Sequence, residues 1–139
     1  MPQMNTDEHR NRDPLTHQVI GTFYEVHTEL GFGFLESVYC RALVVALLDQ
    51  GLSVAPETAI PVLFRGQSVG DYRADLIVEG RLIVEIKAGV SLGPAHRAQL
   101  LNYLRATSME VGLLVNFGEK LTFERFLFTN DRKRTAMHP

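Results

Sequence analysis

Two short segments decide the fold: YRADLIV at residues 72–78 and LIVEIK at residues 82–87. Both are rich in apolar and β-branched residues, so each predicts a β-strand. Side chains alternate between the two faces of a strand, and a slip of one residue would exchange the faces. Matching apolar face to apolar face therefore sets Val78 opposite Leu82 and leaves residues 79–81 as a hairpin loop.

The same register predicts that two acids meet across the hairpin, because it places Asp75 directly opposite Glu85. Like charges that face each other destabilise a sheet, and a carboxylate is costly to bury without a partner. A divalent cation between the acids would remove both costs, and Lys87 lies two residues beyond Glu85. The alternative is a solvated sheet face on which these groups and Arg73 form ion pairs. The other face of the first strand is expected to carry Ala74, Leu76 and Val78.

The composition is that of one globular domain of ordinary size. The chain has 139 residues, of which 45% are hydrophobic, and its formal net charge is -2. There is no overall basic field, so a nucleic acid would have to be held by a local patch. The single cysteine, Cys40, allows no internal disulfide, which fits a reducing cytoplasm. No apolar run approaches the roughly 20 residues that span a bilayer, and residues 1–12 do not resemble a secretory signal.

Helix and strand patterns follow each other in mixed order along the chain. Asp13 and Pro14 are typical of a helix start, and Gly31 of the end of that helix. The expected helices cover about 14–30, 35–50 and 94–107, and the expected strands cover 53–64, 69–78, 81–87, 111–117 and 121–128. Two prolines in the first strand make it an edge or bulged strand. We therefore expect an α/β domain over residues 13–129, with a mixed central sheet flanked by helices, a disordered tail at 1–12 and a polar tail at 130–139.

The helix at 94–107 carries polar side chains at helical spacing. His96, Gln99 and Tyr103 are three and four residues apart, so they share one face. The helix follows the strand of Glu85 closely, so this face could turn toward the acids, with Gln99 holding a water, a carboxylate or a phosphate oxygen. The alternative is an ordinary solvated face. The opposite side is expected to carry Ala98, Leu101 and Leu104.

The helix at 35–50 begins with a second candidate group. Glu36 and Tyr39 lie three residues apart on one face, and Gly33 precedes them. An acid in the first turn of a helix is also explained by the positive end of the helix dipole. Glu36 therefore has two interpretations from the residues alone.

Together these residues resemble a known family. Asp75 followed by Glu85-x-Lys87 is similar to the core of the PD-(D/E)XK nuclease superfamily, and Gln99 lies in the helix where several of its branches carry glutamine. Gly33-x-x-Glu36-x-x-Tyr39, with YRAD, QLLNYL and NFG further along, resembles the small bacterial GxxExxY proteins of that superfamily. The resemblance runs from about residue 15 to residue 128. It implies a restriction-endonuclease-like αβββαβ core with an added N-terminal helix.

The resemblance also implies an activity, which is phosphodiester cleavage with a divalent metal, usually Mg²⁺. It implies that Lys87 helps to position the attacking water, and that Gln99 corresponds to the glutamine of the helix. Ala74 stands where the superfamily's name has proline. The expected metal ligands are Glu36, Asp75, Glu85 and Ile86, and the expected substrate-binding residues are Tyr39, Arg73, His96 and Tyr103.

Two functions of different classes follow. The first is a small nuclease that uses Mg²⁺ or Mn²⁺ and cleaves DNA in preference to RNA, as a homodimer or with a protein partner. The second is a non-catalytic binding or regulatory module that retains the nuclease fold, which the near-neutral charge favours. The full set of acids, lysine and glutamine favours the first. Exposed phenylalanines at 123, 126 or 128 are expected to supply an interface.

Overall fold

The computed structural model of the chain describes residues 13–133, so the expected tail at 1–12 and the end of the expected tail at 130–139 lie outside the described residues. The elements are α2 (Pro14–Leu30), α3 (Glu36–Asp49), β1 (Val54–Phe64), β2 (Gln67–Val78), β3 (Leu82–Lys87), α4 (Pro94–Arg105), β4 (Val111–Phe117), β5 (Leu121–Leu127) and the 3-10 helix η1 (Asn130–Arg132). No helix among them is both long and apolar enough to cross a lipid bilayer.

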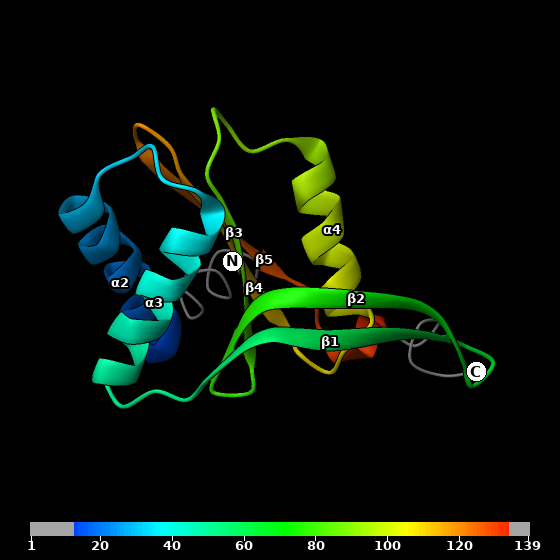
Figure 1. Cartoon of the computed structure of the whole chain (residues 1–139). Coiled ribbons are helices and arrows are strands. Elements are labelled where there is room, and N and C mark those ends of the chain that lie inside the picture. The colour runs from blue at the N-terminus through cyan, green and yellow to red at the C-terminus, as the bar shows by residue number, and fades with distance from the viewer. Residues whose placement is uncertain (1–12, 134–139) are drawn as a thin grey trace, which may run out of the picture.

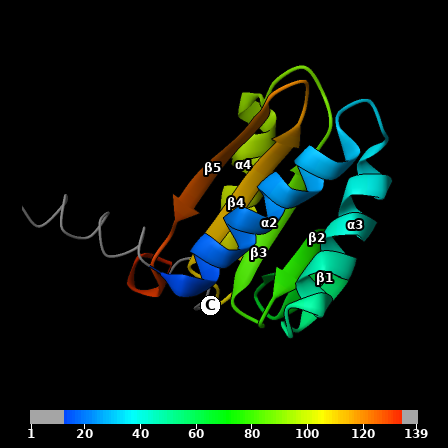
Figure 2. The ribbon, with the colours of Figure 1, turned by 90° about the vertical axis from the view of Figure 1, so that its left-hand side faces the viewer.

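These elements confirm the expected α/β class. The sheet has the order β1-β2-β3-β4-β5, with β3 and β4 parallel and the other neighbours antiparallel. Helix α4 provides the crossover that a parallel pair requires. Figures 1 and 2 show α2 and α3 on one face of the sheet and α4 on the other. The proline-containing β1 lies at the edge, as its sequence predicts.

The core divides into two apolar clusters, one on each face of the sheet. The larger one joins α2 and α3 to the sheet and includes Phe23, Tyr39 and Phe117. The smaller one lies under α4. Helix α4 can lie close to the sheet because Gly112 has no side chain. A Cβ at this position would lie only 2.8 Å from the Leu100 side chain.

Two of the expected side-chain positions on α4 are wrong, those of Ala98 and Tyr103. The buried side chains of this helix are Leu100, Tyr103 and Leu104, whereas Ala98 is exposed and Leu101 is half-buried. Tyr103 therefore belongs to the apolar side of the helix. Its ring has enough apolar surface to pack in the core, which the spacing of polar residues alone did not reveal.

The hairpin register is confirmed at its closed end, where Val78 pairs with Leu82. The expectation for Ala74 is wrong, because Ala74 packs in the cluster under α4 whereas Leu76 packs in the cluster under α2 and α3. The strand thus changes face at Asp75. On β1, the residue that this register places across from Asp75 is Glu57, whose φ of 49° is far from an extended conformation. The paired strands bend at this point.

Beyond the bend, β1 and β2 run on as a two-stranded arm that projects past the body of the domain (Figure 1). We call residues 61–71 the β1–β2 arm. Its pairing extends to Phe64 and Gln67, with a register shift between Val62 and Leu63.

Candidate metal centre

Asp75 and Glu85 lie where β2 separates from β3. The last paired residues of the two strands are Leu76 and Val84. Beyond that pair each carboxylate accepts a hydrogen bond from the opposite main chain. The N–H of Asp75 donates to Glu85 Oε2 at 2.8 Å, and the N–H of Ile86 donates to Asp75 Oδ2 at 2.8 Å. The register read from the sequence thus brings the two acids to one place.

Burial makes it unfavourable for these two acids to be ionised together. Burial, followed by the charge of Asp75, raises the pKa of Glu85 to about 8. Burial also raises the pKa of Asp75, although the hydrogen bond from Ile86 and the charge of Lys87 oppose that rise. Because opposite charge favours the ionised form, a divalent cation between the acids would reverse both shifts.

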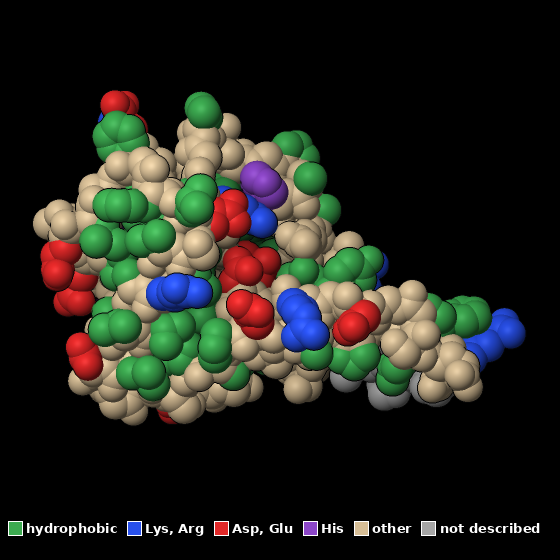
Figure 3. All heavy atoms as spheres, in the orientation of Figure 1, with side chains coloured by type: hydrophobic (Ala, Val, Ile, Leu, Met, Phe, Trp, Pro, Cys, Tyr) green, Lys and Arg blue, Asp and Glu red, His purple; other side chains and the backbone are tan. Residues whose placement is uncertain are grey.

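The charges of Glu36 and Lys87 shift the pKa values of this pair in opposite directions. Lys87 is half-buried at the end of β3, and its charge lowers the pKa of both acids. Glu36 is exposed in the first turn of α3, and its charge raises both. Figure 3 shows acidic and basic side chains gathered around a hollow between the helices at the root of the arm.

The acids fit a divalent cation through two carboxylates rather than three. Within residues 13–133 no three side chains of the types His, Cys, Asp and Glu lie close enough together to hold a metal ion. Mg²⁺ often takes only one or two protein carboxylates and keeps several waters, so the pair at Asp75 and Glu85 satisfies its requirement for hard oxygen ligands. Ile86 could add only its main-chain carbonyl, and Glu36 lies further from the pair.

Gln99 and Tyr103 bring α4 to the same place. Burial, then the charges of Glu85 and Asp75, raise the pKa of Tyr103 to about 12, while a hydrogen bond from the Gln99 side chain opposes the rise. Of the three residues expected on one polar face of α4, Tyr103 is thus the one whose hydroxyl the charges of both acids reach. Tyr103 itself is 3% exposed, which leaves its ring almost no surface for a substrate.

Tyr39 lies in the core rather than at an open surface. Its ring stacks on Phe117 with centroids 4.5 Å apart, and its hydroxyl donates to the carbonyl of Gly31 at 2.7 Å. The expected contact with substrate does not fit a side chain with no exposed area. Tyr39 instead holds the loop before α3, in which Gly31 and Gly33 have φ angles of 72° and 111°, and that loop leads into Glu36.

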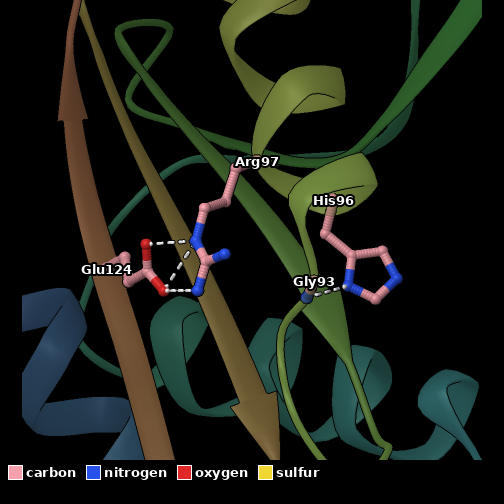
Figure 4. Close-up of polar contacts among 4 residues, drawn as sticks. All are labelled: Gly93, His96, Arg97 and Glu124. Carbon is pink, nitrogen blue, oxygen red and sulfur yellow. Dashed lines mark hydrogen bonds and ion pairs between the residues drawn. The ribbon is translucent and has the colours of Figure 1, made fainter.

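Two other expected residues have partners of their own. His96 accepts a hydrogen bond from the Gly93 N–H through Nδ1 at 3.2 Å and so caps the start of α4 (Figure 4). Arg73 is exposed on β2 and donates to the carbonyl of Glu57 at 3.2 Å. Arg73 is near the acids in sequence and keeps most of its surface in solvent.

The sequence patterns missed two residues near the acids. Burial, followed by the charges of Asp75, Glu57 and Glu85, raises the pKa of Cys40 to about 11, so this thiol stays protonated near neutral pH. Glu57 adds to the pKa of Asp75 as well. The pairing of β1 with β2 would have revealed Glu57, but the prolines of β1 obscured its register.

The comparisons with known proteins identify a family and a fold. A family model described as the PD-(D/E)XK nuclease superfamily matches residues 13–126. The chain therefore belongs to the PD-(D/E)XK nuclease superfamily. The crystal structure of SSO0001 has the same fold, with a TM-score of 0.51 and 22% sequence identity over 73% of this chain. The match covers 54% of SSO0001, so this chain spans about half its length. No curated protein matched the sequence.

Proposed function

We propose that this protein is a small metal-dependent nuclease of the GxxExxY group that cleaves phosphodiester bonds, DNA in preference to RNA. The observation that carries the proposal is the pair of half-buried Asp75 and buried Glu85, with Lys87 at the end of the same strand as Glu85. Ionising both of these acids would destabilise the fold, and the divalent cation expected in a nuclease superfamily would offset that loss.

Asp75 and Glu85 would hold the metal, Mg²⁺ or Mn²⁺, with waters and the main-chain carbonyl of Ile86 as further ligands and Glu36 further from the ion. When bound, such an ion supplies positive charge for the phosphate oxygens and a more acidic water. The acids would bind it as carboxylates, so Glu85 must release its proton first.

Lys87 and Gln99 would act on the substrate. The Lys87 ammonium is a compact charge close to both acids, so it can orient a water and stabilise the charge that develops on a non-bridging oxygen. The Gln99 side chain lowers the pKa of the Tyr103 hydroxyl, which both acids raise, so Gln99 would act beside the same two acids. Arg73 would contact the phosphate backbone from the exposed side of β2.

We also propose a cytoplasmic location and assembly as a homodimer or with a protein partner. The phenylalanines expected at an interface give little support to the second idea. Phe123 packs against the cluster under α2 and α3, and Phe126 and Phe128 pack against the cluster under α4. All three are half-buried within the chain itself.

One observation favours the alternative, a binding or regulatory module without catalysis. Both carboxylates already accept a main-chain N–H at 2.8 Å, so the pair is partly satisfied without an ion. In that case Glu85 stays protonated at neutral pH, and the two acids serve to hold β2 against β3.

Cleavage of plasmid and oligonucleotide substrates with Mn²⁺ separates the two functions. The nuclease proposal requires activity in the wild type and its loss in Glu85→Ala and Lys87→Ala. Glu29→Gln is a matched control, because Glu29 is an exposed acid on α2. Absence of cleavage by the wild type on every substrate, or cleavage that survives both site variants, would refute the proposal.

A further inference from the structure

The β1–β2 arm exposes large apolar side chains to water, which gives it little stability of its own. An isolated pair of strands is marginally stable in water, and large apolar side chains on such a pair gain little by folding. Yet Leu63, Phe64 and Val69 are 58%, 58% and 62% exposed. The arm lies at the far end of the molecule from α2 and α3, and Figure 3 shows hydrophobic and basic side chains at its end.

The end of the arm combines an aromatic ring with a cation. Between Phe64 and Gln67 the chain turns through Arg65 and Gly66, both with positive φ, as a two-residue hairpin loop requires. Asn, Asp or Gly is the usual first residue of such a turn, so an arginine with φ 52° is an uncommon choice. Its guanidinium lies over the Phe64 ring, 4.9 Å from the centroid.

The arm is continuous with the candidate metal centre. Strand β2 runs from the turn directly to Asp75, and Arg73 lies two residues from that acid. At about 3.3 Å per residue, the end of the arm lies roughly 25 Å from Asp75. That length corresponds to about seven nucleotides of a stacked strand. One nucleic acid could therefore contact both places.

The pairing of an aromatic ring with an arginine at the end of the arm favours a nucleic acid over a protein partner. The arm carries two charged residues, Arg65 at its end and Asp71 at its root. Exposed aromatic rings with arginine form platforms on which bases of single strands stack, and such stacking tolerates any sequence. In a regular duplex the base faces are covered, and reaching them requires unstacking.

We propose that the β1–β2 arm binds the bases of the substrate, with Phe64 and Arg65 stacking on accessible bases roughly 25 Å from the phosphate at Asp75. The inference rests on the proposed nuclease function and narrows its substrate class. The substrate is a nucleic acid with unpaired bases on one side of the cleavage position: a single strand or a duplex with an unpaired stretch.

Fluorescence anisotropy with end-labelled oligonucleotides in Ca²⁺ tests the inference. The probes are a single strand of about 20 nucleotides, the matching duplex, and the duplex with an internal unpaired loop. We expect the full-length wild type to bind the first and third more tightly than the second. Phe64→Ala should weaken that binding at least about fivefold, as loss of one stacked base does elsewhere, and Phe64→Trp should retain it.

Leu48→Ala is the matched control, because Leu48 is 54% exposed on α3 and lies away from the arm. It should bind like the wild type. Equal affinities for Phe64→Ala and the wild type would overturn the role of the arm, and so would tighter binding of the regular duplex. Circular dichroism verifies that each variant is folded.

Two other results would overturn the inference in different ways. If Phe64→Ala changes the mass measured by sedimentation, the arm is a contact between protein chains. If the wild type binds none of the probes, the inference fails together with the proposed function. Failure of the arm alone leaves intact the metal-dependent cleavage that Glu85→Ala removes, so the two failures are distinguishable.

Discussion

Two contacts between charged side chains show opposite solutions to the same problem. Arg97 on α4 and Glu124 on β5 carry opposite charges and form a two-pronged ion pair, with N···O distances of 2.7 to 3.0 Å (Figure 4). Asp75 on β2 and Glu85 on β3 are both acids, so they would carry like charges if both were ionised. Each is hydrogen-bonded to the other's strand. The first pair is more than a third exposed, whereas Glu85 is 3% exposed.

The difference between the two pairs shows which of them lowers the stability of the fold. Glu124 has its pKa lowered by Arg97, as a stabilising partner does, whereas Glu85 has its pKa raised by burial and by Asp75. A surface ion pair contributes little to stability, and a buried pair of acids lowers it. Asp75 and Glu85 are therefore better explained by a ligand than by folding.

The largest effect is expected on cleavage. Glu85→Gln keeps the size of the side chain and removes the carboxylate, so we expect the Mn²⁺-dependent rate to fall by about 10³-fold or more. Glu124→Gln removes a carboxylate from the exposed pair and should leave the rate unchanged. Equal losses in the two variants would erase the distinction between the pairs.

The next effect is on stability as a function of pH without metal. The pKa of Glu85 is raised in the folded state from 4.5 to about 8, so the folded protein binds the proton more tightly than the unfolded chain. The stabilisation that Glu85 contributes is therefore fully present below about pH 4.5. It is lost as the pH rises from there through about 8, and the loss is a few kcal/mol at most.

Urea denaturation in EDTA at several pH values measures this loss. Glu85→Gln cannot titrate, so its stability should change less over the same range. A wild type whose stability rises from pH 5 to pH 8 would show that the acid pair is ionised and satisfied in the fold.

A smaller effect is expected at Tyr39. Tyr39→Phe removes the hydrogen bond to the Gly31 carbonyl but keeps the stacking on Phe117, so it should cost about 1 kcal/mol of folding free energy. The loop that leads to Glu36 loosens, so the rate of cleavage should also fall. A variant as stable and as active as the wild type would show that the Tyr39 hydroxyl contributes neither to folding nor to cleavage.

The smallest effect is expected for the exposed pair. Arg97→Gln should leave the midpoint of thermal unfolding close to that of the wild type at physiological salt, because solvent and salt screen the pair. Differential scanning fluorimetry measures it beside Glu85→Gln in EDTA. A large loss of stability in Arg97→Gln would mean that the pair holds α4 on β5.

Much of the fold could be predicted because strong local patterns agreed with tertiary packing. The proline start of α2, the hairpin register at Val78 and Leu82, and the edge position of β1 all depend on short-range rules. The face of Ala74 could not be predicted, because the strand changes face at the bend across from Glu57. A positive φ in a strand has no signal in the alternation of apolar residues.

The candidate site was predictable only in part, for a related reason. The meeting of Asp75 and Glu85 follows from the register alone. The burial of Tyr39 and Tyr103 does not follow, because a tyrosine suits a core and a binding surface equally well. The arm went unrecognised because a sequence pattern gives no indication of whether a strand pair lies on the body or projects from it.

Calorimetric titration with Mn²⁺ near pH 7 is the most direct test of the central claim, that Asp75 and Glu85 together bind one divalent ion. We expect one ion per chain in the wild type and no binding in Asp75→Ala or Glu85→Gln. It also predicts proton release from Glu85, detected as a dependence of the heat on the buffer. Absence of binding in the wild type, or binding in either variant as tight as in the wild type, would contradict this claim.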